Sequence, residues 1–221
     1  MLLATSALAS AALPITVAHA GSIAAWKNPS IDGNFNNGDN WIGSVVPDGT
    51  ATFGSTNQDD ITFSQQTNLG TLSLLDNTRA YTFTNRSTLT FTGAGIVLQD
   101  GVAASITNLS SLNFSGSSTA GRASISNNDG ATIIFRDTSQ VGAGQALITN
   151  FSGGTLLFAV KASAETAEIH NFSSGDDFFK FDNESTAANA KIFNSGDLHF
   201  IGNSTADKAF IQSEPLEKVR E

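Results

Sequence analysis

Ala-Leu-Ile-Thr-Asn, at residues 146–150, is one of five full copies of the pattern Ala-x-Ile-x-Asn, and the copies recur every 19 to 23 residues. The other copies begin at Ala104, Ala123, Ala167 and Ala190, and a sixth, from Ala209, has Ser213 in place of asparagine. A repeat of this length is typical of a solenoid, in which each copy is one coil stacked on the next. Because the three fixed residues are two positions apart, they point to one side of a strand, which we expect to be the interior.

A series of phenylalanines recurs in step with this pattern. Its members are Phe114, Phe135, Phe158, Phe181 and Phe200, spaced 21, 23, 23 and 19 residues apart. Stacked coils would place their rings in one apolar column, where each offset aromatic contact adds about 0.5–1.5 kcal/mol. The repeat therefore predicts an aromatic stack inside the solenoid.

Two further features of the repeat suggest how its coils are held and turned. The asparagines can form a ladder in which each side-chain amide bonds to those above and below it. Glycines follow the asparagines at Gly130, Gly153, Gly175 and Gly196, where a chain leaving a strand is expected to need a positive φ.

The fold class that these patterns predict is all-β, a right-handed parallel β-helix. Residues 60–213 have room for about seven or eight coils, which at about 4.8 Å each make a solenoid some 35 Å long. Charged residues make up only 14% of the chain, and its glycine count is 20. Such a composition suits turns and solvated strands better than amphipathic helices.

Residues 1–20 are expected to be a signal peptide. An apolar stretch up to Val17 is followed by Ala18-His19-Ala20, which fits the small-x-small rule for cleavage before Gly21. The alternative is a membrane anchor, but the stretch is shorter than the ~20 residues that a bilayer requires and contains Pro14. The mature chain is therefore expected to be exported.

The overall composition excludes several classes of function. The chain has no cysteine, so disulfides, thiolate zinc sites and a cysteine nucleophile are impossible. Its formal net charge is −9, with a pI near 4.6, which argues against nucleic acid and anionic membranes as partners.

Residues 21–59 differ from the repeats and are expected to form an N-terminal cap. Trp26 and Trp41 lie in a stretch rich in asparagine, glycine and aspartate, and Asn-Gly and Asp-Gly pairs predict turns. The tryptophans are expected to cover the open end of the first coil, since terminal repeats of solenoids need caps. The alternative interpretation is a platform on which sugars stack.

The same segment resembles the start of many autotransporter passenger domains of type V secretion. The resemblance rests on Trp26, on Gly-Asp-Asn-Trp at residues 38–41 and on Val-Pro-Asp-Gly-Thr-Ala-Thr-Phe at residues 46–53. The later Phe-x3-Ser-Thr-Ala-x2-Ala-x-Ile-x-Asn-x2-Gly repeats resemble autotransporter-associated β-strand repeats, and together the two cover most of residues 26–212. This resemblance implies a β-helical passenger that a C-terminal β-barrel translocates to the cell surface, where it acts as an adhesin or stalk.

The chain departs from that family at its end. Residues 214–221 form a polar, charged tail without repeat character, and the alternating strands of a translocator barrel do not occur in the sequence. We expect a truncated passenger whose intact parent has the barrel. The alternative is a barrel on another polypeptide.

Few residues are candidates for catalysis or metal binding. His170 and His199 each neighbour an inward residue and are expected to point outward, and no Gly-x-Ser-x-Gly elbow supports a serine triad. One carboxylate cluster, with Lys180 inside it, fits the calcium and base of a polysaccharide lyase, although solvated turn residues are the favoured interpretation. The cluster consists of Asp176, Asp177, Asp182 and Glu184, with Asp59 and Asp60 as a weaker pair.

The function expected from these observations is that of a non-enzymatic surface protein at the outer membrane or outside the cell. Its outward serine, threonine and asparagine rows would meet a host or matrix ligand, either protein or glycan. We expect no catalytic residues, no cofactor, no metal and no cytoplasmic partner. The alternatives are an exported β-helical carbohydrate-active enzyme, such as a polysaccharide lyase, and a degraded product without a role of its own.

Overall fold

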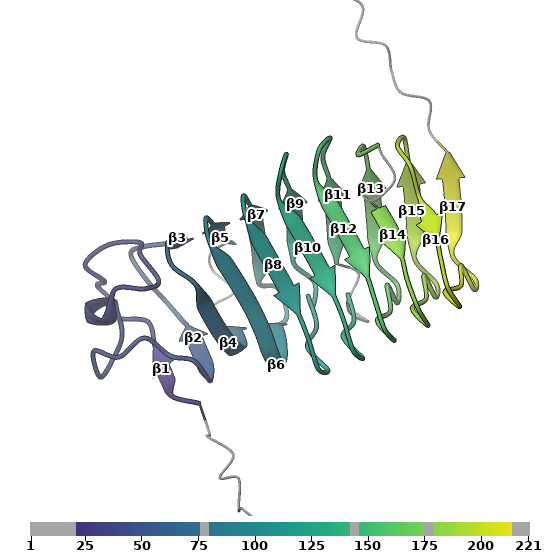
Figure 1. The fold of residues 1–221 in the computed structure, drawn as a ribbon. Helices are drawn as coiled ribbons and strands as arrows, with labels where there is room; N and C mark the ends of the chain where they lie inside the picture. Colours follow the sequence, from purple (N-terminus) through teal and green to yellow (C-terminus); the bar gives the residue numbers. More distant parts are fainter. Residues whose placement is uncertain (1–20, 76–79, 142–145, 175–178, 214–221) are drawn as a thin grey trace, which may run out of the picture.

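Figure 1 shows a computed structural model of the chain, which describes residues 21–75, 80–141, 146–174 and 179–213. The chain forms a parallel β-solenoid, in which each coil adds one strand to each of two sheets. The nine-stranded sheet contains β1 (Ile23–Ala25), β2 (Thr50–Phe53), β4 (Thr67–Leu74), β6 (Thr88–Leu98), β8 (Ser111–Phe114), β10 (Thr132–Phe135), β12 (Thr155–Phe158), β14 (Phe179–Phe181) and β16 (His199–Phe200). The eight-stranded sheet contains β3 (Asp60–Phe63), β5 (Ala80–Asn85), β7 (Ala103–Asn108), β9 (Ser124–Asn127), β11 (Leu147–Asn150), β13 (Glu168–Asn171), β15 (Lys191–Asn194) and β17 (Phe210–Ser213).

The all-β parallel solenoid predicted from the repeat is confirmed, whereas its right-handedness stays a prediction. The one helical element of the described residues is η1 (Gly38–Asn40), a single 3-10 turn. Within these residues no helix is both long and apolar enough to cross a membrane.

A third, narrower ladder runs between the two sheets. In the later coils, the segment that follows a strand of the nine-stranded sheet contains a bridging residue before the chain enters the eight-stranded sheet; the first member of the ladder, Gly95, lies within β6 itself. These bridging residues pair in parallel from coil to coil, in the order Gly95, Thr119, Gln140, Ser163, Thr186 and Thr205. The Ser-Thr-Ala part of the repeat is therefore a structural element as well as a turn.

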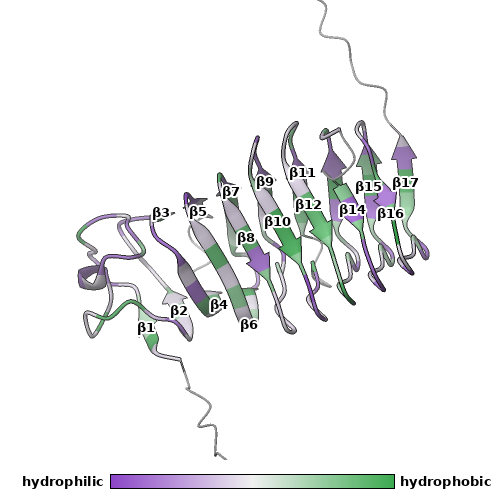
Figure 2. Cartoon of the chain, in the orientation of Figure 1, coloured by the Kyte–Doolittle hydropathy of each residue, from purple (hydrophilic) through white to green (hydrophobic). Residues whose placement is uncertain are grey.

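Side chains alternate between the interior and the solvent along the strands from β7 to β14, as period-two patterning requires. In β11, Ile148 and Asn150 are fully buried, while Leu147 and Thr149 are half-buried on the outer surface. Hydropathy follows this alternation only in part, since β10 and β12 are green over most of their length in Figure 2. The inward direction predicted for alanine, isoleucine and asparagine of the repeat is confirmed.

The phenylalanines form the predicted stack. Centroid distances are 4.6 Å for Phe114–Phe135, 5.0 Å for Phe135–Phe158, 4.6 Å for Phe158–Phe181 and 4.9 Å for Phe181–Phe200. The rings of each pair lie within 12° of parallel. Phe91 extends the column by one coil, 5.1 Å from Phe114.

The asparagines form the predicted ladder, which begins one coil earlier than the repeat, at Asn85. Nδ2 to Oδ1 distances are 2.8 Å for Asn85–Asn108, 2.8 Å for Asn108–Asn127, 2.7 Å for Asn127–Asn150, 2.8 Å for Asn150–Asn171 and 2.7 Å for Asn171–Asn194. Each Nδ2 group in this series also donates to backbone carbonyls, as Asn127 does to Thr155 O at 2.8 Å. The buried amides therefore form hydrogen bonds with one another and with backbone carbonyls of the neighbouring turns. These bonds offset the cost of removing the amides from water.

The turns after the asparagines agree with the predicted glycine conformation at two positions. Gly130 and Gly153 have φ of 70° and 80°. The prediction is wrong at Gly196, which has no positive φ; there a Cβ would lie 1.8 Å from Ser173 O, so glycine is needed for close approach. Gly175 lies outside the described residues.

The turn after each of the strands β8, β10, β12, β14 and β16 has a left-handed residue at its second position. Gly116, Asp137, Val160, Asn183 and Gly202 occupy it in successive coils, with φ between 58° and 64°. A β-branched residue with this φ is a genuine outlier, whereas glycine and asparagine adopt it readily.

Val160→Asn is therefore expected to raise the free energy of unfolding by about 1 kcal/mol, because it relieves left-handed strain at an exposed position. Thermal or urea unfolding measures the gain. The control is Val45→Asn, since Val45 is also exposed but has no positive φ. If both variants melted at the wild-type temperature, Val160 would carry no strain.

The N-terminal segment closes the first coils with aromatic side chains. Trp26 packs against Trp41 and Phe53 with centroids 4.9 and 5.2 Å away, and Phe35 lies 4.4 Å from Phe63 of the first coil. Trp41 Nε1 donates to Phe35 O at 2.8 Å. The segment expected to be a cap, residues 21–59, also contributes β1 and β2 to the nine-stranded sheet.

A polar network around Asp32 fixes the loops of this cap. Its carboxylate accepts hydrogen bonds from Asn40 Nδ2 at 2.6 Å, from Asn34 N at 2.9 Å and from Asn37 Nδ2 at 3.1 Å. The bond from Asn40, aided by the Asn34 N–H, lowers the pKa of Asp32 below its ordinary value. A carboxyl whose pKa is lowered by folding stabilises the folded state above its unfolded pKa, and that contribution is lost as the pH falls through its folded pKa.

The cap is therefore expected to loosen below about pH 4. Trp26 and Trp41, the only two tryptophans of the chain, both lie in it, so intrinsic fluorescence during an acid titration reports its opening. Asp32→Asn should remove this acid-dependent component, whereas Asp39→Asn, at an exposed carboxylate of the same cap, should leave it. An unchanged titration curve for Asp32→Asn would contradict the assignment.

Candidate functional site

The outer surface of the eight-stranded sheet carries a regular array of hydroxyl groups. Parallel pairing without a register shift places equivalent residues of successive coils side by side. One row consists of Thr62, Thr84, Thr107, Ser126 and Thr149, and the row beside it of Thr82, Ser105 and Ser124. We call these eight residues the hydroxyl face.

The hydroxyl face is directed to the solvent and not to the protein. Among the described residues, none of its eight hydroxyl groups has a hydrogen-bond partner in the chain, and all eight residues are exposed or half-buried. On the nine-stranded sheet, by contrast, Asn113 Nδ2 donates to Ser111 Oγ at 3.2 Å and to Thr90 Oγ1 at 3.5 Å. The hydroxyl face therefore retains its hydrogen-bonding capacity for a ligand.

Farther along the same sheet, the outward residues change from hydroxyl to aromatic. His170 stacks on Phe193 with centroids 4.8 Å apart, and Phe151 stacks on Phe172 at 6.4 Å. With Phe210, these residues form what we call the aromatic end. Phe210 lies edge-on to Phe193 and is 55% exposed, so the aromatic end keeps some apolar surface open to solvent.

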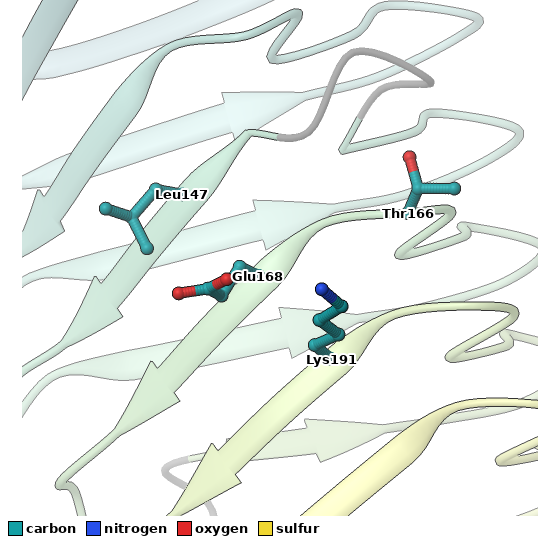
Figure 3. A pocket seen from close by; sticks show the side chains of 4 residues that line it. All are labelled: Leu147, Thr166, Glu168 and Lys191. Atoms are coloured by element: carbon teal, nitrogen blue, oxygen red, sulfur yellow. The ribbon is translucent and has the colours of Figure 1, made fainter.

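A shallow depression of about 230 Å³ borders the aromatic end. Figure 3 shows Leu147, Glu168 and Lys191 on the adjacent strands β11, β13 and β15, with Thr166 on the turn before β13. The carboxylate of Glu168 is turned away from the Lys191 ammonium, and its Oε1 lies 2.8 Å from His170 Nε2. The two charged groups that line the depression, Glu168 and Lys191, are therefore not directed to a common point within it.

The two tryptophans do not form a sugar platform. Trp26 is 5% exposed and Trp41 is fully buried, and both pack within the cap. The alternative interpretation of these residues is therefore wrong, because a stacking platform requires exposed ring faces.

The two histidines lie on different sheets. His170 is on β13 of the eight-stranded sheet and His199 on β16 of the nine-stranded sheet. Both are half-buried and directed outward, as predicted. They cannot act on one substrate group.

The carboxylates of the candidate cluster have structural neighbours. Asp182 Oδ1 accepts from Asn183 N at 2.6 Å, and Glu184 Oε2 lies 3.6 Å from Lys161 Nζ. Lys180 is on β14, whereas Asp60 begins β3 of the other sheet, and Asp59 precedes it. Asp176 and Asp177 lie outside the described residues.

In the part of the chain that the structure describes, no three His, Cys, Asp or Glu side chains gather closely enough to hold a metal ion.

Sequence reasoning missed the aromatic end. Phe151 and Phe172 each follow a ladder asparagine directly, and this spacing could have revealed it.

In comparisons with known proteins, no family model, curated protein or solved structure matches the chain.

Proposed function

We propose that this chain is a non-enzymatic, exported scaffold of the passenger type, displayed on the cell surface as a stalk or adhesin. The observation that carries the proposal is the uninterrupted interior of the solenoid. The asparagine ladder and the phenylalanine stack link each coil to the next. A stack of this kind is stiff along its axis and projects its outward rows, which suits a stalk that presents a ligand-binding surface.

The leader expected at residues 1–20 and the resemblance to autotransporter passengers support surface display. The translocator barrel would belong to an intact parent protein. The adhesive part would be the outer surface of the eight-stranded sheet, and its ligand a host or matrix protein or glycan.

Protease treatment of intact source cells tests the proposal. An antibody against the chain should detect a protein that begins at Gly21 and is digested by protease added outside the cells. A cytoplasmic marker should resist the same treatment. A chain protected in intact cells and digested only after lysis would contradict surface display.

A substrate assay tests the non-enzymatic part of the proposal. The purified chain, incubated with polyuronides and calcium, should release no unsaturated sugar products. Calcium-dependent cleavage would instead support the lyase alternative.

A further inference from the structure

We propose that the hydroxyl face binds ice. This inference goes beyond the scaffold function and does not depend on where the chain is displayed. It rests on the composition, spacing and unpaired state of the eight hydroxyl groups.

The spacing of the hydroxyl face is close to that of a tetrahedral water lattice. Parallel strands place equivalent residues about 4.8 Å apart along the solenoid, and alternate residues of one strand about 6.6 Å apart. Oxygens joined tetrahedrally by hydrogen bonds of about 2.75 Å have second neighbours about 4.5 Å apart and a lattice repeat of about 7.3 Å. Rotation about χ1 moves each hydroxyl oxygen relative to its strand and so absorbs the remaining differences.

The chemistry of the face favours ordered water over other ligands. Each hydroxyl both donates and accepts, as a lattice water does, and each threonine adds a methyl group. All eight positions carry a hydroxyl group and none is charged or aromatic, so the face recognises a ligand through hydroxyl hydrogen bonds and methyl contacts alone. A ligand for this face must itself be periodic and must supply donors and acceptors at every coil.

The underlying sheet keeps the array in register. The pairings from β3 to β11 run without a shift across five consecutive strands, and the buried Asn85–Asn150 part of the ladder lies directly beneath them. Because the backbone beneath the face is held in register, only the side-chain rotamers have to be ordered when the lattice binds.

Ice-affinity partitioning of the full purified chain tests the proposal. A cooled surface grows ice slowly from the protein solution, and the chain is measured in the ice and in the remaining liquid. The wild-type chain should be enriched in the ice and should inhibit ice recrystallisation, whereas serum albumin is excluded. Exclusion of the wild-type chain would overturn the proposal.

Thr107→Tyr, at the centre of the hydroxyl face, should abolish enrichment, because the ring holds the lattice away from the neighbouring rows. The matched control is Thr132→Tyr, since Thr132 is a half-buried outward threonine at the centre of the other sheet. It should partition as the wild type does. Thr107→Val, which keeps the methyl shape and the β-branched backbone preference, should weaken enrichment with an unchanged melting temperature.

Two results would reassign the face. If Thr107→Tyr and Thr132→Tyr partitioned alike, binding would not involve the eight-stranded sheet. Retention on crystalline cellulose or chitin that Thr107→Tyr abolishes, with exclusion from ice, would identify a polysaccharide lattice as the ligand and overturn the proposal.

Discussion

Ile148→Asp is expected to unfold the solenoid, with a loss of about 4–5 kcal/mol or more in the free energy of unfolding. Ile148 is fully buried on β11 and pairs in register with Ile125 and Ile169 of the neighbouring coils. An aspartate there would place a carboxylate between two apolar coils without a partner. Since domains of this size are stable by only about 5–15 kcal/mol, one such charge is enough to disrupt the stack.

Thr149→Asp, one residue farther along β11, is the control. Its side chain points to the solvent beside His170, so the change should cost less than about 0.5 kcal/mol. Urea unfolding followed by circular dichroism compares the two variants. Equal losses at both positions would mean that the inside and outside of the strand are wrongly assigned.

Asn150→Leu is expected to cost about 2–3 kcal/mol, although leucine has nearly the same shape as asparagine. Asn150 accepts from Asn127 at 2.7 Å and donates to Asn171 Oδ1 at 2.8 Å and to Gly154 O at 3.1 Å. Leucine can neither accept nor donate these hydrogen bonds. The buried polar groups of the coils above and below would then lose their partner. The cost of these unpaired groups exceeds the gain from burying an apolar side chain.

Asn189→Leu provides the comparison at an exposed asparagine outside the ladder, where the change should be close to neutral. Chemical denaturation of both variants measures the difference. Native-state hydrogen exchange should also show increased opening of β9 and β13 in Asn150→Leu. A stability equal to that of the wild type would mean that the ladder fills space without holding the coils.

Much of the architecture could be predicted because the fixed residues of the repeat are the ones whose side chains point inward. Alanine, isoleucine and asparagine at positions two residues apart define the strands β7, β9, β11, β13 and β15 of the eight-stranded sheet. The phenylalanine series defines strands of the nine-stranded sheet. Asn85 was missed as a ladder member because its coil replaces the pattern with Tyr81-x-Phe83-x-Asn85. The strands β1 and β2 were missed because they are only three and four residues long and are separated by loops.

The conformations of the turns could be predicted only in part. Glycine marks a left-handed position at Gly116 and Gly202, but the same position is filled by Val160 in another coil. The valine itself does not indicate this φ, but alignment of the repeats does, because the residue two positions after each phenylalanine of the column is glycine, aspartate or asparagine in the other coils. Outward rows of serine, threonine and asparagine were predicted from the repeat, but which residues share a row follows only from the register of successive coils.

The most direct test of the stacked architecture is a distance between two outward residues of the hydroxyl face. The chain has no cysteine, so Thr62→Cys/Thr149→Cys can be spin-labelled at these two positions alone. The residues are 87 positions apart in sequence but belong to one row, and four strand spacings separate them by about 19 Å. Double electron–electron resonance should give one narrow distribution near that distance. A broad distribution that extends well beyond it would contradict the solenoid and the hydroxyl face with it.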